Sequence, residues 1–107
     1  MKVDHRSGAK VGQLVRVLKG KDAGSVAVVV AIVDTKFVLI ADGHKRKFDQ
    51  PKRKNVQHLE LTPIISSEVV HSLQESGRVT NAKLRYAVHA FVQSANQMLK
   101  RKETDCG

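Results

Sequence analysis

The fold is decided by the stretch Gly12-Gln-Leu-Val-Arg-Val-Leu-Lys-Gly-Lys-Asp-Ala-Gly24, which runs directly into Ser25-Val-Ala-Val-Val-Val-Ala-Ile-Val33. Val15 and Val17 alternate with Arg16 in a strand expected over residues 13–18, and a nine-residue strand pattern follows a turn that holds two glycines and two lysines. Glycine lets the chain reverse there because it adopts positive φ at little steric cost. The pattern predicts a β-hairpin with Lys19 and Lys21 at its tip.

Both faces of the strand expected at residues 25–33 are apolar. A strand with two apolar faces is covered on both of them. In a small barrel one face fills the interior, so a second element must cover the outer face. The two apolar sets are Val26, Val28, Val30 and Ile32 on one face and Ala27, Val29, Ala31 and Val33 on the other.

Further strand and turn signals follow this hairpin. Asp42-Gly43 is typical of a tight hairpin turn because both central positions favour positive φ. Pro51 interrupts pairing since it lacks a backbone N–H, and Leu59 and Leu61 are expected to point inward from the last strand. Five short strands separated by turns predict a small SH3-like β-barrel. The additional strands are expected at residues 36–41, around 46–48 and at about 55–61.

After the last strand the apolar spacing becomes helical. Ser66 or Ser67 can cap a first helix that stops at Gly77, and Thr80 can cap a second helix that reaches about Lys100. Apolar residues of the second helix recur at spacings of 3, 4 and 7 and are expected to cover the outer face of the barrel. An exposed stripe would instead predict dimerisation; we expect a monomer when the protein is free. The stripe comprises Leu84, Ala87, Val88, Phe91, Ala95, Met98 and Leu99.

The sequence therefore predicts one α+β domain, in which a five-stranded SH3-like barrel is followed by two C-terminal α-helices. A chain of 107 residues suffices for a single core. Residues 1–10 are expected to form a flexible basic arm, residues 11–62 the barrel, and residues 63–107 a helical extension that packs on the barrel and ends in a frayed tail. The lone Cys106 allows no internal disulfide.

The charge balance favours a polyanionic partner. Nineteen Lys and Arg against ten Asp and Glu give a net charge of +9, which is typical of nucleic-acid-binding proteins, with an anionic membrane surface as the competing partner. No apolar run reaches membrane-spanning length and no signal-peptide core follows the N-terminus, so we expect a cytoplasmic protein with no membrane partner. The small aromatic share, 4%, argues against base recognition on aromatic platforms.

Residues 44–54, His-Lys-Arg-Lys-Phe-Asp-Gln-Pro-Lys-Arg-Lys, hold the densest positive charge. Two Lys-Arg-Lys triplets contribute six cations against the carboxylate of Asp49. Such density costs stability unless an anion neutralises it, and a phosphate backbone would do so while releasing counterions. The alternative is a solvated basic loop that only keeps the domain soluble.

A second basic region begins at the expected second helix. No carboxylate lies between Glu75 and Glu103, whereas Lys83 and Arg85 stand near the helix start. Lys83 occupies the position where a capping box has Glu, and a cation there opposes the helix dipole. Two interpretations stay open: the amino end of this helix faces phosphate, or the pattern is chance surface composition.

The hairpin stretch resembles a KOW motif, with Gly24 at the hallmark glycine. The resemblance continues through residues 39–47 and 51–59, and less sharply through 77–91, to small bacterial KOW-domain RNA-binding proteins related to an archaeal and eukaryotic large-subunit ribosomal protein. It implies an SH3-like barrel that binds RNA, with rRNA or the large ribosomal subunit as partner at the ribosome or during its assembly. The candidate RNA-binding residues are Lys19, Lys21, Gly24, Lys45, Arg46, Lys47, Lys52, Arg53, Lys54, Lys83 and Arg85.

Other function classes find less support in the sequence. The histidines show no HxxxH or HxxE pair, and no nucleophile arrangement is recognisable; we expect no catalytic residue, metal, cofactor or small-molecule substrate. A KOW-type protein-interaction module is one alternative, which would use outward apolar residues such as Phe48 or Tyr86. Nonspecific condensation of nucleic acid is another. For Gly24, plain turn geometry competes with close approach to RNA.

Overall fold

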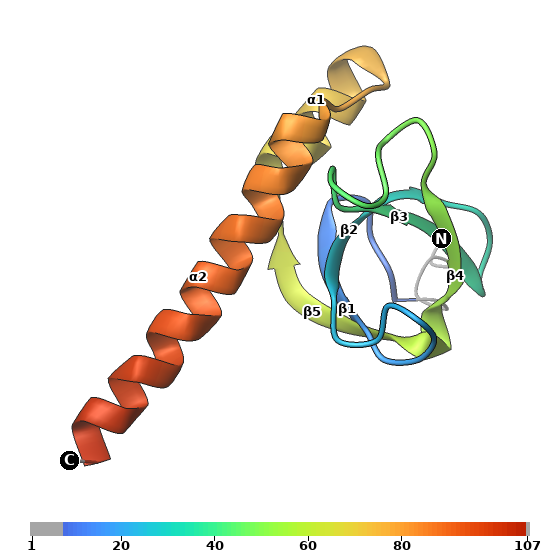
Figure 1. The fold of residues 1–107 in the computed structure, drawn as a ribbon. Coiled ribbons are helices and arrows are strands. Elements are labelled where there is room, and N and C mark those ends of the chain that lie inside the picture. The colour runs from blue at the N-terminus through green and yellow to red at the C-terminus, as the bar shows by residue number, and fades with distance from the viewer. Residues whose placement is uncertain (1–7, 107) are drawn as a thin grey trace.

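A computed structural model describes residues 8–106 of the chain, with side chains described for residues 8–95. It consists of a five-stranded sheet followed by two helices (Figure 1). Most of the predicted N-terminal arm, residues 1–7, lies outside the described residues. The elements are β1 Gln13–Val17, β2 Val26–Ile32, β3 Phe37–Ala41, β4 Lys52–Asn55, a short 3-10 helix Val56–His58, β5 Leu59–Ile65, α1 Ser67–Ser76 and α2 Asn81–Cys106.

The strands form one antiparallel sheet in the order β4-β3-β2-β1-β5. The sheet curls into a barrel shape (Figure 1), but its edge strands β4 and β5 are not paired with each other in the described part of the chain. The predicted α+β class, with an SH3-like barrel followed by two helices, is confirmed. The barrel is an open one.

Strand β2 is buried on both faces from Ala27 to Val30, as its sequence predicts, whereas Ile32 and Val33 of the two predicted apolar sets are 42% and 49% exposed. Its neighbouring residues Val28 and Val29 are both 0% exposed but belong to separate cores. Val29 packs inside the curled sheet with Val15 and Ile40. Val28 packs on the outer face beneath the helices, with a cluster of Leu14, Val30, Ala41, Val69, Val79, Leu84 and Ala87.

Both ends of α1 and the start of α2 lie at the predicted capping residues. The Ser66 hydroxyl accepts a hydrogen bond from the Val69 amide, and Gly77 closes α1 with a φ of 76°. The Thr80 hydroxyl accepts from the Lys83 amide at 3.2 Å at the start of α2. Because these caps satisfy amides that have no partner within the helix, they fix where each helix begins.

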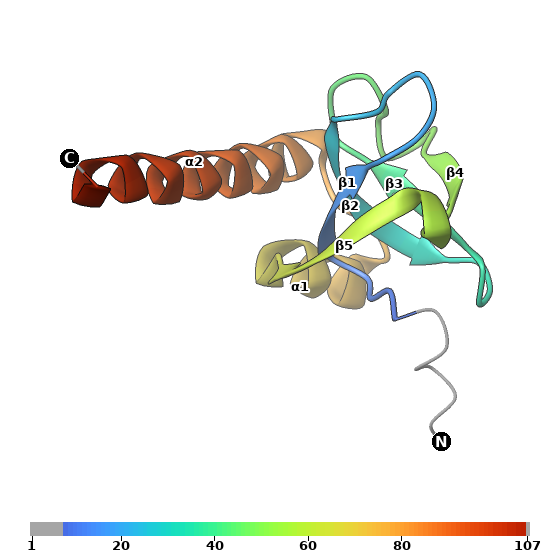
Figure 2. The ribbon, with the colours of Figure 1, turned by 90° about the horizontal axis from the view of Figure 1, so that it is seen from below.

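Helix α2 covers the outer core with its first turns and then projects beyond the sheet (Figures 1 and 2). Leu84, Ala87, Val88 and Phe91 of the predicted stripe pack there, while the Met98 and Leu99 side chains lie outside the described part. The helix continues to Cys106 instead of ending near residue 100.

The predicted fourth strand around residues 46–48 is wrong. These residues belong to a loop over 42–51, and the strand is β4 at Lys52–Asn55, paired with β3. The Asp42 carboxylate accepts hydrogen bonds from the His44 and Arg46 amides, both at 2.9 Å, and the Arg46 carbonyl accepts from the Asp42 amide at 2.9 Å. The loop thus uses backbone groups of Arg46 that a sheet ladder would need.

The last strand also differs from its predicted bounds. Residues 56–58 form the 3-10 helix, capped by the Asn55 side chain, and β5 extends to Ile65. Pro63 lies in β5 where the register with β1 shifts, since Leu61 pairs with Val15 and Ile65 with Gln13, and bulges on edge strands are places where proline is tolerated.

Candidate nucleic-acid interface

Two loops lie at the same end of the sheet and face each other across the opening of the barrel (Figure 2). They are the hairpin loop at residues 18–25 and the loop at residues 42–51. Strands β1 and β2 are antiparallel, as are β3 and β4, so both turns fall at this end. Between them is a pocket of about 130 Å³, called here the barrel mouth. Its lining comprises Val17, Asp22, Ser25, Ala27, Ile40, Asp42, His44, Lys45, Arg46, Lys52 and Lys54.

The hairpin loop is held by backbone hydrogen bonds. The Gly24 amide donates to the Val17 carbonyl at 2.7 Å, and the Ala23 amide to the Gly20 carbonyl at 3.2 Å. Gly24 has a φ of 94°, yet a Cβ there would meet no atom within 4 Å. Glycine is therefore favoured at this position by its backbone conformation, and the space beside it is open. Lys19 and Lys21 are exposed on the loop.

The second basic triplet is divided between the two faces of β4. Residues Lys52 and Lys54 pair with the interior residues Ile40 and Val38, so they lie on the concave face and are half-buried. The Lys54 ammonium donates to the Lys19 carbonyl at 3.0 Å, which joins β4 to the hairpin loop. Arg53 lies on the opposite face, with its guanidinium carbon 4.1 Å from the centroid of the Phe37 ring.

The first triplet, Lys45 to Lys47, is exposed on the 42–51 loop, and that loop is anchored to α2. The Phe48 amide donates to the Asn81 side chain at 2.8 Å, and the Arg85 guanidinium donates to the Gly43 carbonyl at 2.8 Å. Phe48 also packs against the outer core instead of pointing outward. The loop that carries the cations thus has a fixed base.

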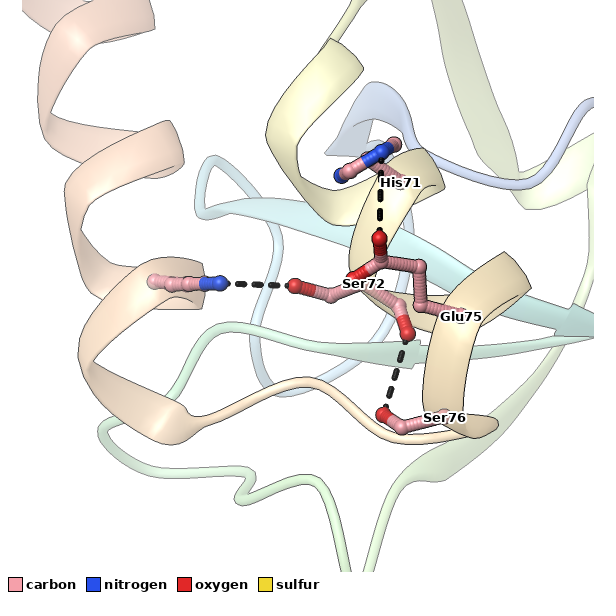
Figure 3. Close-up of polar contacts among 5 residues, drawn as sticks. His71, Ser72, Glu75 and Ser76 are labelled. Atoms are coloured by element: carbon pink, nitrogen blue, oxygen red, sulfur yellow. Dashed lines mark hydrogen bonds and ion pairs between the residues drawn. The ribbon is translucent and has the colours of Figure 1, made fainter.

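Lys83 and Arg85 are not brought to the mouth. Arg85 contacts the base of the 42–51 loop, whereas the Lys83 ammonium donates to the Ser72 hydroxyl of α1 at 2.8 Å (Figure 3). The same view shows an exposed pair on α1, in which the His71 ring lies 3.5 Å from the Glu75 carboxylate. Both cations therefore make contacts that connect parts of the fold.

At the other end of the barrel, the turn between β2 and β3 holds a carboxylate with a shifted pKa. The Asp34 side chain accepts hydrogen bonds from the Lys36 and Phe37 amides, both at 2.8 Å. These bonds, with a smaller contribution from the nearby Arg53 charge, hold the Asp34 pKa below its ordinary value of 3.8.

A second hollow lies on the helical side of the molecule. It is an apolar groove of about 290 Å³ between β5, the start of α1 and α2. Tyr86 is 65% exposed beside it, and Ile64 is 48% exposed. We call this hollow the α2 groove. The sequence marked Tyr86 as a possible contact but not the groove, because the groove unites segments that are distant along the chain.

Residues 8–106 contain neither a helix long and apolar enough to cross a membrane nor a cluster of three or more His, Cys, Asp or Glu residues suited to a metal ion. Sequence reasoning missed four polar residues of the mouth: Asp22, Ser25, Asp42 and His44. A sequence signal existed for Asp42, which precedes glycine in a turn motif, but its place opposite the hairpin loop depends on the long-range pairing of the strands.

Known proteins resemble most of the chain. The KOW motif matches residues 11–40. YbzG of Bacillus subtilis (strain 168), named as a candidate ribosome-binding protein, is 46% identical over 71 residues, which cover 66% of this chain and 96% of YbzG. The large ribosomal subunit protein eL14 of Metallosphaera sedula is 32% identical over 87 residues, or 74% of this chain and 91% of that protein. The eL14 protein of Hyperthermus butylicus is 32% identical over 76 residues, or 64% of this chain and 78% of that protein.

Proposed function

The chain belongs to the family of KOW-motif proteins that includes YbzG and the eL14 large ribosomal subunit proteins. We propose, from this premise, that it is a non-catalytic RNA-binding protein that acts at the ribosome or during ribosome assembly. The proposed partner is structured rRNA, and the proposed place of action is the cytoplasm, where such a complex would form. The relatives' names, one for ribosome binding and one for the large subunit, support this choice of partner.

The observation that carries the proposal is the gathering of cations around the barrel mouth. Lys45 and Arg46 come from one loop and Lys52 and Lys54 from β4, yet all four line one opening. Like charges held this close repel one another, and a phosphate backbone would relieve that repulsion while releasing its own counterions. Arg46 can bind a phosphate with two hydrogen bonds, whereas the lysines act as point charges.

Crosslinking of the protein to RNA in cells, followed by sequencing of the bound RNA, tests the proposal. The site variant replaces Lys45, Arg46 and Lys52 with Gln and leaves Lys54, which bonds the hairpin loop. A matched control removes three exposed cations away from the mouth, with Lys10, Lys36 and Arg78 replaced by Gln.

We expect wild-type reads to concentrate on a few rRNA segments, to be lost in the site variant and to persist in the control. Reads scattered over many RNAs, or unchanged by the site variant, would reject the rRNA site. Equal affinity for duplex DNA and rRNA in solution would favour nonspecific condensation of nucleic acid instead.

The α2 groove favours a second candidate function, docking on a protein within a ribosome or transcription complex. Its exposed aromatic and aliphatic side chains, Tyr86 and Ile64, are of the kind that fills protein interfaces. Under this alternative, ribosome association would be insensitive to salt and would be lost when both residues are changed to Ser. Retention of association in that double variant would exclude it.

A further inference from the structure

We propose that the barrel mouth receives a single unpaired base of the bound RNA, while the cations of its rim hold the phosphates on either side of that base. The inference rests on the proposed RNA-binding function and specifies the element that the protein would recognise. With such a site, the protein would recognise bulged or looped-out nucleotides within structured RNA.

The floor of the mouth suits the face of a base. It is formed by Val17, Ala27 and Ile40, which belong to the interior core and are 2%, 6% and 4% exposed. Ala27 is the smallest of the three, and its short side chain leaves room at this end of the core. An apolar floor favours an uncharged planar group over a phosphate, because a buried phosphate there would lose its hydration.

The size of the mouth limits the occupant to a small group. Its volume of about 130 Å³ is well below the roughly 300–1,000 Å³ of pockets that enclose drug-sized ligands. A single base is of suitable size, and a stacked pair of bases is not. A base within a helix cannot enter because it is stacked and paired, whereas bases in loops and bulges can be turned outward.

The rim offers both signs of charge. Lys45, Arg46 and Lys52 can contact the phosphates next to an inserted base, while the carboxylates of Asp22 and Asp42 line the same opening. Carboxylates repel phosphate but accept hydrogen bonds from the amino groups of bases. Asp42 already holds its own loop through the His44 and Arg46 amides, so the carboxylate of Asp22 is the one that a purely phosphate-binding surface would not need, and it fits a site in which a base edge lies between two phosphates.

Both sides of the mouth are fixed before any ligand binds. The bond from Lys54 to the Lys19 carbonyl holds the hairpin loop to β4. On the other side, the Phe48 amide donates a hydrogen bond to the Asn81 side chain, and the Arg85 guanidinium donates one to the Gly43 carbonyl. These two bonds hold the 42–51 loop to α2. A preformed site loses less conformational entropy when its ligand binds.

The test compares two short RNA duplexes that differ only in one unpaired adenosine. We expect the wild-type protein to bind the bulged duplex about tenfold more tightly, the ratio that corresponds to burial of roughly 60 Å² of apolar surface. Ser25→Leu at the rim and Ala27→Leu at the floor should each fill the mouth and abolish the preference while the fully paired duplex still binds. Thr35→Leu, placed at the opposite end of the barrel, should retain it.

The outcomes separate this inference from the function on which it rests. Equal wild-type affinity for the two duplexes would overturn the base site and leave RNA binding intact. Failure of the wild-type protein to bind either duplex or an rRNA fragment would overturn the proposed function itself. Persistence of the preference in both filled variants, each shown by thermal unfolding to be folded, would likewise reject the mouth as the site.

Discussion

At the scale of single residues, side-chain direction decides which cations can act together. Lys52 and Arg53 are neighbours in the sequence, but the pleat of β4 turns Lys52 toward the barrel mouth and Arg53 toward Phe37 on the opposite face. The triplet therefore does not form one patch. Arg53 makes a cation–π contact with Phe37 within the fold, whereas Lys52 and Lys54 on either side of it line the barrel mouth.

This alternation makes a direct comparison possible. Lys52→Gln should weaken rRNA binding about threefold, the loss expected for one partly exposed charge contact, and Arg53→Gln should weaken it less. Both variants remove one positive charge, so a filter-binding assay at one salt concentration compares them fairly. A larger loss for Arg53→Gln would move the interface to the outer face of β4.

Two glycines with nearly equal backbone angles differ in their surroundings. Gly43 and Gly77 have φ values of 78° and 76°. A Cβ at Gly43 would collide with the Asn81 carbonyl of α2, whereas one at Gly77 would meet no atom within 4 Å. Gly43 thus allows the close approach of the 42–51 loop to the helix.

Gly77→Ala should lower the free energy of unfolding by about 1–2 kcal/mol, because alanine is strained in the left-handed region. Gly43→Ala should cost about 1–3 kcal/mol more, since the added methyl group also forces the loop and α2 apart. Denaturant unfolding of the two variants measures the difference. Equal losses would show that the loop does not pack closely on α2.

Asp34 gives stability a weak dependence on acid pH. Its folded pKa lies below the ordinary value because the ionised carboxylate accepts two backbone amides. Its contribution is therefore present above the unfolded pKa and is lost as the pH falls through the folded value. Asp34→Ala should destabilise the protein at neutral pH, and this deficit should shrink below pH of about 4. Thermal unfolding against pH measures it, with Thr35→Ala as the control; a constant deficit would contradict this account.

At the scale of elements, α2 covers the outer face of β2, a strand that is apolar on both faces. Its residue Leu84 is 0% exposed and packs in the outer core that contains Val28 and Val30. The same helix anchors the 42–51 loop through Asn81 and Arg85. Stability of the outer core and position of the cations are therefore linked through one element.

Leu84→Ala should lower the free energy of unfolding by about 2–5 kcal/mol, as for other large-to-small changes in a packed core. Tyr86→Ala, two residues away and exposed, should change it by no more than about 0.5 kcal/mol. Urea unfolding separates the two cases. A small loss for Leu84→Ala would mean that α2 does not cover the sheet.

Some elements could be predicted from the sequence because the signals are local or periodic. The two apolar faces of residues 25–33 predicted that a further element covers the outer face of this strand. Ser66, Gly77 and Thr80 predicted helix ends that the structure confirms. The fourth strand was misplaced because the Asp42 side chain binds the amides of its own loop. The mouth could not be predicted, since it depends on which ends of distant strands meet.

At the scale of the whole molecule, the net charge of +9 is distributed unevenly. Four cations surround the barrel mouth, with Lys19 and Lys21 exposed on the adjacent hairpin loop. Lys83 and Arg85, in contrast, contact α1 and the 42–51 loop. The proposed rRNA-binding surface is thus one end of the barrel, and the α2 groove lies apart from it on the helical side.

The most direct test measures affinity for purified large ribosomal subunits over a series of salt concentrations. Wild-type protein should lose affinity steeply with salt, because binding to phosphates releases counterions. The variant with Gln at Lys45, Arg46 and Lys52 should bind more weakly and flatten the log–log slope by about 2–3, roughly one for each phosphate contact removed. The control with Gln at Lys10, Lys36 and Arg78 should keep the wild-type slope. Equal losses in the two variants would show that overall charge, and not the barrel mouth, drives binding and would contradict the central claim.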